Sequence, residues 1–192
     1  MFQVAFSDES LFQAQPAGYR KQWQPPKSPP AIRPVHRHPV KVMVWSLFCM
    51  QGTGRLHIVE GNMNKEQYLH VLRTRMAIQM REWFPNGDGI FMHDRAPCHT
   101  ARVCSQYLQD EGFQVLDWPG NSPDLNPIEN LWGIIKNKLQ GSTITTRGDL
   151  ICQVIKIWHR DASIPEYLNN LVASMPHRLQ QVIDLKGGFT KY

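Results

Sequence analysis

The sequence lacks any acidic residue between Ser10 and Val59, although the chain of 192 residues carries 16 Asp and Glu in all. The same stretch holds seven basic residues: Arg20, Lys21, Lys27, Arg33, Arg37, Lys41 and Arg55. Positive charge without acids creates a local field that suits a phosphate backbone. A solvated basic hairpin without a ligand explains the pattern equally well. The seven are therefore candidate backbone contacts to a nucleic acid, and Trp23 among them is a candidate for stacking on a base.

The sequence also lacks paired cysteines and long apolar runs. Its four cysteines contain no Cys-x-x-Cys pair, so we expect reduced thiols, as in the cytosol or nucleus, and no disulfide scaffold. A zinc site from Cys98, His99 and Cys104 stays an alternative, although the spacing fits no common pattern. The longest largely apolar run, 42–50, is too short to span a bilayer, and no basic segment of a signal peptide precedes the first apolar run. We therefore expect no membrane association.

What is present is an alternation of strand-like and helix-like segments. Apolar and β-branched runs predict strands at 2–6, 40–50, 55–60, 90–93 and 113–118. Helical spacing and caps predict helices at about 64–83, 100–111, 127–139, 147–160 and 165–184. The Gln- and Pro-rich segment 11–41 cannot be a central strand and predicts a long basic hairpin or loop. We predict one α/β domain over 1–192, with a mixed central sheet flanked by helices.

Three carboxylates fall where α/β sheets build ligand sites, at strand ends and helix starts. Asp8 is expected to end the first strand, Asp94 follows the 90–93 strand, and Glu129 opens a helix, with 34 residues between it and Asp94. Grouped carboxylates resist joint ionisation, and divalent cations with oxygen ligands remove that cost. Two Mg²⁺ ions roughly 3.5–4 Å apart can activate an attacking hydroxyl and stabilise the leaving oxygen of a phosphodiester.

Each acid also has an ordinary structural explanation. Asp8 could close a turn at a strand end, and Asp94 could be a solvated loop residue. Asn126, Pro127 and Glu129 fit a helix N-terminus in which Asn126 caps the helix and Glu129 completes a capping box. A metal site requires all three acids to converge.

Five segments add a specific pattern: FSDESLF (6–12), MVWSLFCMQGTGRLHIVEGNMN (43–64), FMHDRAPCHTA (91–101), LDWPGNSPDLNPIENLW (116–132) and LKGGFTKY (185–192). In this order they resemble the catalytic domain of Tc/mariner-superfamily DDE transposases, of the Tc-type branch. The resemblance implies a ribonuclease-H-like fold and Mg²⁺-dependent DNA hydrolysis and strand transfer, with Mn²⁺ as a substitute. It matches Asp8, Asp94 and Glu129 to a triad that binds two ions, with His99 and Asn126 in matching motifs beside it.

The resemblance also implies partners. The first is DNA, both the transposon ends and the target, which is bound mainly through its backbone. The second is another copy of the chain in a homodimer. It further implies work in the nucleus. The segment around Gly52 and Gly54 resembles a hairpin that contributes to DNA contact and subunit pairing.

The sequence departs from the family pattern at several positions. Arg95 stands where a neutral Asn usually follows the second acid, and its guanidinium could compete with a cation or hold a phosphate. Ser46 and Leu47 replace a Gly-Cys pair. The family's paired helix-turn-helix region has no counterpart in these residues, so we expect no sequence-specific recognition of transposon ends by them alone. A truncated or host-retained remnant that binds DNA or a partner without catalysis is therefore the alternative function.

Overall fold

The computed structural model describes residues 3–14, 39–120, 122–140 and 142–188. Its strands form one six-stranded mixed sheet within these residues: β1 (Val4–Gln13), β2 (Lys41–Cys49), β3 (Gly52–Thr53), β4 (His57–Val59), β5 (Ile90–Met92) and β6 (Gln114–Val115). The strand order is β3-β2-β1-β5-β6, and β4 also pairs with β2. β1 runs antiparallel to β2 but parallel to β5, which is parallel to β6.

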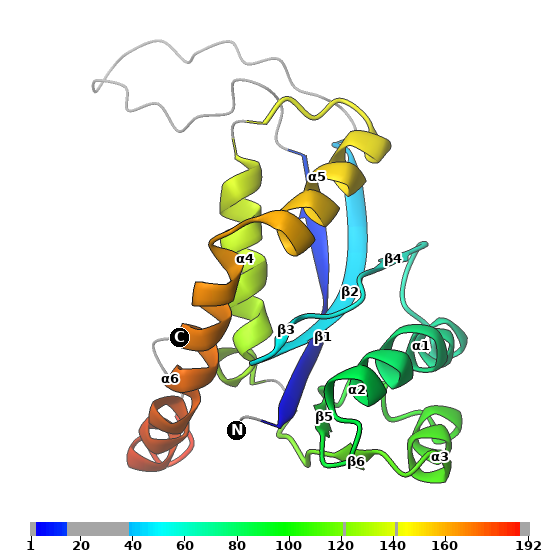
Figure 1. Cartoon of the computed structure of the whole chain (residues 1–192), viewed down its shortest axis with the longest axis vertical. Helices are drawn as coiled ribbons and strands as arrows, with labels where there is room; N and C mark the ends of the chain where they lie inside the picture. The colour runs from blue at the N-terminus through cyan, green and yellow to red at the C-terminus, as the bar shows by residue number, and fades with distance from the viewer. Residues whose placement is uncertain (1–2, 15–38, 121, 141, 189–192) are drawn as a thin grey trace.

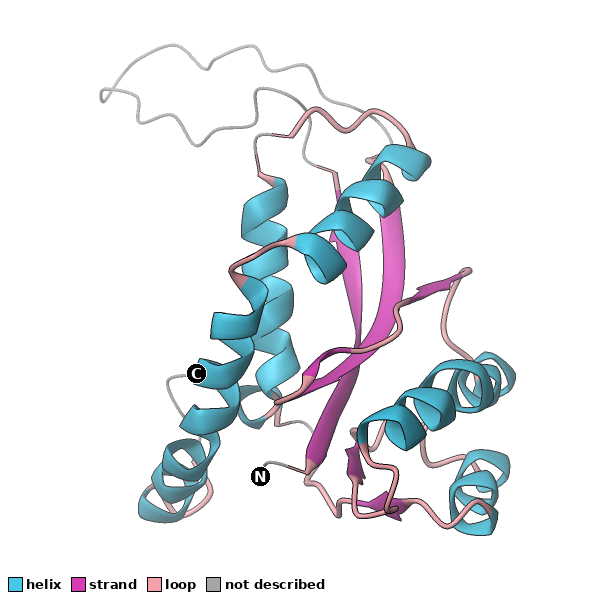
Figure 2. Ribbon diagram, in the orientation of Figure 1, coloured by secondary structure: helices cyan, strands magenta, loops and turns pink. Residues whose placement is uncertain are grey.

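Helices cover both faces of this sheet (Figures 1 and 2). One layer contains α1 (Lys65–Val71), the π-helical turn η1 (Leu72–Met76), α2 (Ala77–Trp83) and α3 (Arg102–Asp110). The other contains the 3₁₀ turn η2 (Pro123–Leu125), α4 (Pro127–Leu139), α5 (Arg147–Arg160) and α6 (Ile164–Asp184). The predicted α/β class, with a mixed sheet between helices, is confirmed.

Alternation along β1 separates two apolar cores. Phe6 and Phe12 pack with Trp132 in the core under α4–α6, whereas Ala5 packs with Tyr68 in the core under α1–α3. Successive side chains of a strand point to opposite faces of its sheet. Even-numbered residues of β1 therefore face α4, and odd-numbered residues face α1 and α3.

The helix expected at 64–83 is present, with one irregularity. Asn64 and Gln67 form a reciprocal capping box at its start. The predicted apolar stripe is buried at Tyr68 and Met80 as well as at Leu72 and Met76. The π-helical turn η1 separates α1 from α2, and no pattern in the sequence predicts it. Such single π turns inside helices often accompany functional sites.

Three predicted boundaries were wrong. β1 does not end at Asp8 but continues to Gln13, because its backbone pairs with β2 as far as Gln13 opposite Lys41, whatever the polarity of the side chains. The expected loop over 11–41 is shorter at both ends for the same reason; 15–38 lie outside the described residues. Thr100 does not cap α3, which begins at Arg102.

The described residues contain no helix that is both long and apolar enough to cross a membrane. The four cysteines are all free, as expected for reduced thiols: Cys49, Cys98, Cys104 and Cys152.

Candidate active site

Parallel pairing of β1 with β5 brings Asp8 and Asp94 together. Phe6 lies opposite Met92, the last residue of β5. Asp8 lies two residues after Phe6 on β1, and Asp94 lies two residues after Met92, where the chain has left β5. Asp8 is therefore inside its own strand but at the carboxyl end of its parallel neighbour, which is where sheets of this kind place ligand sites. The charge of Asp94 acts on Asp8 accordingly.

Helix α4 delivers the third acid. Pro127 occupies the first helical turn, as its fixed φ favours, and Glu129 lies exposed in the same turn. The predicted N-cap position of Asn126 is confirmed, but the side-chain cap hydrogen bond expected of it is not formed. The side chain of Asn126 is buried, and its Nδ2 instead donates to the Ser7 carbonyl across 3.3 Å. Asn126 thereby joins the start of α4 to β1 at the residue before Asp8.

Asp8 is costly to ionise in this setting. Burial, together with the charges of Glu129 and Glu9, raises the pKa of the Asp8 carboxyl to about 8. Its Oδ2 is buried and has no hydrogen-bond partner in the described residues. A buried oxygen without a partner, close to other carboxylates, fits a bound cation, because only a positive charge compensates both its desolvation and the repulsion.

The three acids form an open arrangement. Among the described residues, no three His, Cys, Asp or Glu side chains are grouped closely enough to hold one ion as they stand. Mg²⁺ does not require such a group, since it usually keeps several waters and takes one or two carboxylates together with substrate phosphates. The alternative zinc site at Cys98, His99 and Cys104 is not formed.

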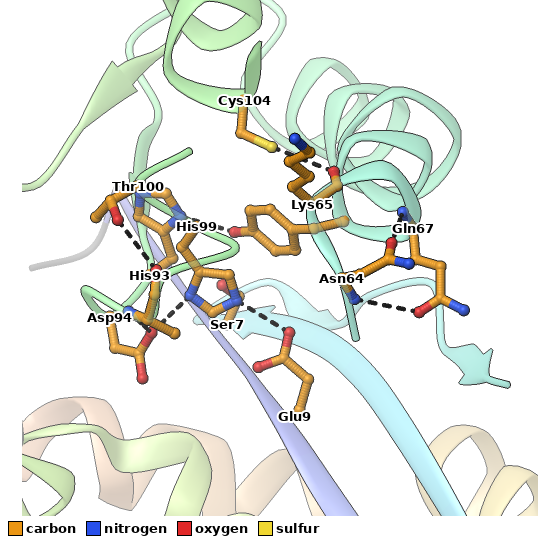
Figure 3. A network of polar contacts seen from close by, with 12 residues as sticks. Ser7, Glu9, Asn64, Lys65, Gln67, His93, Asp94, His99, Thr100 and Cys104 are labelled. Carbon is orange, nitrogen blue, oxygen red and sulfur yellow. Dashed lines mark hydrogen bonds and ion pairs between the residues drawn. The ribbon is translucent and has the colours of Figure 1, made fainter. Parts of the chain in front are cut away.

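His99 links Asp94 to a carboxylate that the sequence analysis missed (Figure 3). Its Nδ1 donates to Asp94 Oδ1 across 2.5 Å and its Nε2 donates to Glu9 Oε1 across 3.1 Å. Burial alone lowers the pKa of His99, but the hydrogen bonds to Asp94 and Glu9 outweigh it and raise the pKa to about 9. At neutral pH both ring nitrogens therefore carry protons and both donate.

Asp94 uses its two oxygens differently. Oδ1 accepts from His99 and from the Ala96 backbone N–H at 2.9 Å. The hydrogen bond from His99 holds the pKa of Asp94 below its usual value. Oδ2 has no hydrogen-bond partner within the described part of the chain. Asp94 is thus ionised and oriented, with one oxygen left for a ligand.

Aromatic rings enclose His99. The Tyr68 ring lies 4.1 Å from the His99 ring, centroid to centroid, and His93 stacks on His99 at 5.4 Å. Tyr68 donates its hydroxyl to His93 Nδ1 across 2.7 Å, and burial together with the charge of His99 lowers the pKa of His93 to about 4. His93 is therefore neutral and can accept this hydrogen bond.

Arg95, the departure that follows Asp94, has an acidic partner. Its guanidinium donates to Asp117 Oδ1 across 2.5 Å, and both side chains are largely exposed. We expect Arg95→Asn to change the affinity for Mg²⁺ or Mn²⁺ by less than about threefold, since the neighbouring carboxylate already compensates the charge and exposed pairs are worth about 0–1 kcal/mol. Calorimetric titration with Mn²⁺ measures this. A tenfold gain in affinity would mean that Arg95 repels the cation after all.

The candidate DNA contacts are mostly outside the described residues. This holds for Arg20, Lys21, Trp23, Lys27, Arg33 and Arg37. Lys41 is exposed at the start of β2. Arg55 forms an ion pair with Glu82, which offsets its charge. Gly54 contacts Leu47 so closely that an added Cβ would lie 2.7 Å from Leu47 Cδ2, so this part of the predicted hairpin is packed against β2.

Arg178 is a second residue that the sequence analysis missed. It is 1% exposed, on α6, and its Nη1 donates to the Asp124 carbonyl at 2.9 Å and to Asn130 Oδ1 at 2.7 Å. It therefore holds the loop before α4 and the first turn of α4. The signal was an arginine at helical spacing on the apolar stripe of Leu168, Val172 and Met175.

Residues 3–152 match the family described as DDE superfamily endonuclease. The chain belongs to this family. Tc transposases are also similar to most of this chain, which confirms the Tc-type resemblance. The Tc3 transposase of Caenorhabditis elegans is 33% identical over 98% of this chain and 58% of its own length. The Tc1 transposase of the same organism is 35% identical over 79% of this chain and 54% of its own length. The chain thus spans a little over half the length of these relatives.

A solved structure confirms the ribonuclease-H-like fold of this DDE domain. The mariner Mos1 paired-end complex with Mg aligns with a TM-score of 0.83 over 98% of this chain and 57% of that chain. The identity is 20%, so this likeness bears on the fold alone.

Proposed function

We propose that this DDE domain is the catalytic domain of a cut-and-paste transposase of the Tc type. Its substrate is DNA, and its reactions are hydrolysis of a phosphodiester and transfer of the resulting 3′ end to a target. The observation that carries the proposal is Asp8, whose buried Oδ2 has no partner among the residues that the structure describes, while Asp94 and Glu129 lie close enough to affect its charge.

The three acids divide the work by position. Asp8 interacts with both Asp94 and Glu129, so we propose that these three acids together would hold two Mg²⁺ ions. Bound divalent ions supply an activated hydroxyl and stabilise the leaving oxygen. Mn²⁺ substitutes, since it accepts the same oxygen ligands. Asn126 supports the site by joining α4 to β1, and His99 supports it by orienting Asp94.

Basic residues outside the triad would bind the DNA backbone. Lys41 is exposed for this role, and the acid-free segment that precedes it supplies the remaining charge. As parts of the same proposal, the active assembly is a homodimer that joins two transposon ends, and it works in the nucleus on chromosomal DNA.

Metal binding separates this proposal from its alternative, a remnant that keeps the fold without catalysis. We expect Mg²⁺ and Mn²⁺ to raise the melting temperature, because a ligand bound only by the folded state adds about 2.7 kcal/mol at one hundred times its Kd. For a protein of this size that is roughly 5–10 °C. Differential scanning fluorimetry in EDTA and in millimolar metal measures it. An unchanged melting temperature, together with no nicking of duplex DNA, would favour the remnant.

A substrate comparison tests the choice of DNA. The same protein, with Mn²⁺, is incubated with duplex DNA and with an RNA–DNA hybrid of identical sequence. We expect nicking and joining of the duplex. Cleavage confined to the RNA strand of the hybrid would assign this domain to a ribonuclease activity instead.

A further inference from the structure

Glu9 has no role in the triad, yet it is a carboxylate in direct contact with the site. It follows Asp8 on β1, and its side chain is 18% exposed. Because neighbouring residues of a strand point to opposite faces, Asp8 faces α4 while Glu9 faces α1 and α3. Glu9 therefore projects from the opposite face of β1 to Asp8 and reaches the site through His99, which also bonds to Asp94.

We propose that Glu9 is a positioning residue that acts through His99 on Asp94. The inference rests on the proposed function, since it concerns the same metal site. Glu9 Oε1 accepts from His99 Nε2, and His99 Nδ1 donates to Asp94 Oδ1. The chain of contacts passes from the back of β1, through the ring, to the acid that follows β5. It fixes which oxygen of Asp94 is occupied and leaves Oδ2 for the cation.

The surroundings of His99 restrict the orientation of its ring. His99 is 2% exposed and packs against the rings of Tyr68 and His93. Its backbone N–H bonds to the Ala96 carbonyl at 2.9 Å, which anchors the turn after Asp94. Packing fixes the plane of the His99 ring, and the hydrogen bond from Nε2 to Glu9 fixes the orientation of the ring within that plane. Groups that hydrogen-bond directly to a metal ligand, as His99 does to Asp94, typically contribute 10–100-fold to metal affinity or activity, and Glu9 acts through this bond.

The test compares three single variants. Glu9→Met keeps the length of the side chain but removes the carboxylate, Glu9→Gln keeps an oxygen that can accept from His99 Nε2, and Glu66→Met removes an exposed acid of α1 as a matched control. Calorimetric titration gives the Kd for Mn²⁺, and nicking assays give kcat and KM for DNA. We expect Glu9→Met to weaken Mn²⁺ binding 10–100-fold and to lower kcat with little change in KM. Glu9→Gln should recover most of the loss, and Glu66→Met should match the wild type.

A double-mutant cycle tests whether Glu9 acts through the ring. If it does, Glu9→Met should cost less than about threefold in Mn²⁺ affinity when His99 is already replaced by Ala, because coupled residues are not additive. Full additivity of the two losses would overturn the inference. So would a Glu9→Met protein whose Mn²⁺ affinity equals that of the wild type.

The contact itself is readable without metal and without substrate. In ¹⁵N-edited spectra of the metal-free wild-type protein, the Nε2–H of His99 should exchange slowly, and Glu9→Met should abolish that signal while Glu9→Gln retains it. A rapidly exchanging proton in the wild type overturns the inference even if the variants do not fold. Wild-type protein that neither binds Mn²⁺ nor nicks DNA would instead refute the proposed function, whatever the spectra show.

Discussion

Asp94→Asn is expected to abolish metal-dependent nicking and joining of DNA, with a loss on the order of 10³-fold or more, equivalent to about 4 kcal/mol of transition-state stabilisation. The reason lies in how Asp94 uses its oxygens. An Asn can keep Oδ1 as the acceptor for His99 and the Ala96 N–H. Those contacts then place an NH₂ group where Oδ2 stood, and an amide nitrogen does not ligate Mg²⁺. The fold survives while the ligand is lost.

Plasmid nicking in Mg²⁺ and Mn²⁺ measures this loss, and the melting temperature in EDTA reports on the fold. Asp110→Asn serves as the control, because Asp110 is an exposed acid at the end of α3 that accepts a hydrogen bond from Gln106 at 2.8 Å. Nicking by Asp94→Asn at the wild-type rate would remove Asp94 from the site and, with it, the proposed mechanism.

Asp8→Asn is expected to raise the melting temperature of the metal-free protein and to eliminate the stabilisation by Mg²⁺ or Mn²⁺. In the folded protein the pKa of Asp8 is raised to about 8 from an ordinary value of 3.8, first by burial and then by Glu129. The folded state therefore binds a proton more tightly than the unfolded state. Stability is greatest below pH 3.8 and is lost as the pH rises toward 8, so a neutral Asn gains over Asp across that interval.

Scanning fluorimetry in EDTA at pH 5 and pH 8.5 tests the sign. We expect the advantage of Asp8→Asn to be larger at pH 8.5. Asp161→Asn is a control with the opposite sign, because the hydrogen bonds from Ser163 and Lys138 lower the pKa of Asp161 to about 2 and removing its charge should destabilise. An Asp8→Asn protein that melts below the wild type at pH 8.5 without metal would show that Asp8 has a polar partner in the fold.

The layout of the fold could be predicted because it depends on local patterns. The strand at 40–50 is apolar and β-branched, and the final helices show clear helical spacing. The limits of β1 could not be predicted, since they depend on where β2 pairs with it and not on its own side chains. The hydrogen bond from the Asn126 side chain to the Ser7 carbonyl could not be predicted for a similar reason, because Ser7 lies on a strand 119 residues earlier in the chain.

Of the candidate site, the sequence predicted the acids but not their surroundings. The motifs identified Asp8, Asp94 and Glu129, and the fold brings them together. Glu9 was passed over because it stands next to Asp8, and only the strand geometry shows that the two point to opposite faces. The pairing of Arg95 with Asp117 joins residues on two loops, which no periodicity reveals.

Arg178 bears on where this catalytic unit ends. The family match stops at residue 152, after the last of the three acids. Arg178 lies beyond that point, on α6, yet it donates to the Asp124 carbonyl and to Asn130 on either side of Glu129. An expression boundary drawn at 152 would retain Asp8, Asp94 and Glu129 but would remove the contacts of Arg178 that hold the residues on either side of Glu129. The smallest fragment able to fold into a working centre must therefore include the C-terminal helix, and transplanting or trimming this domain should respect that limit.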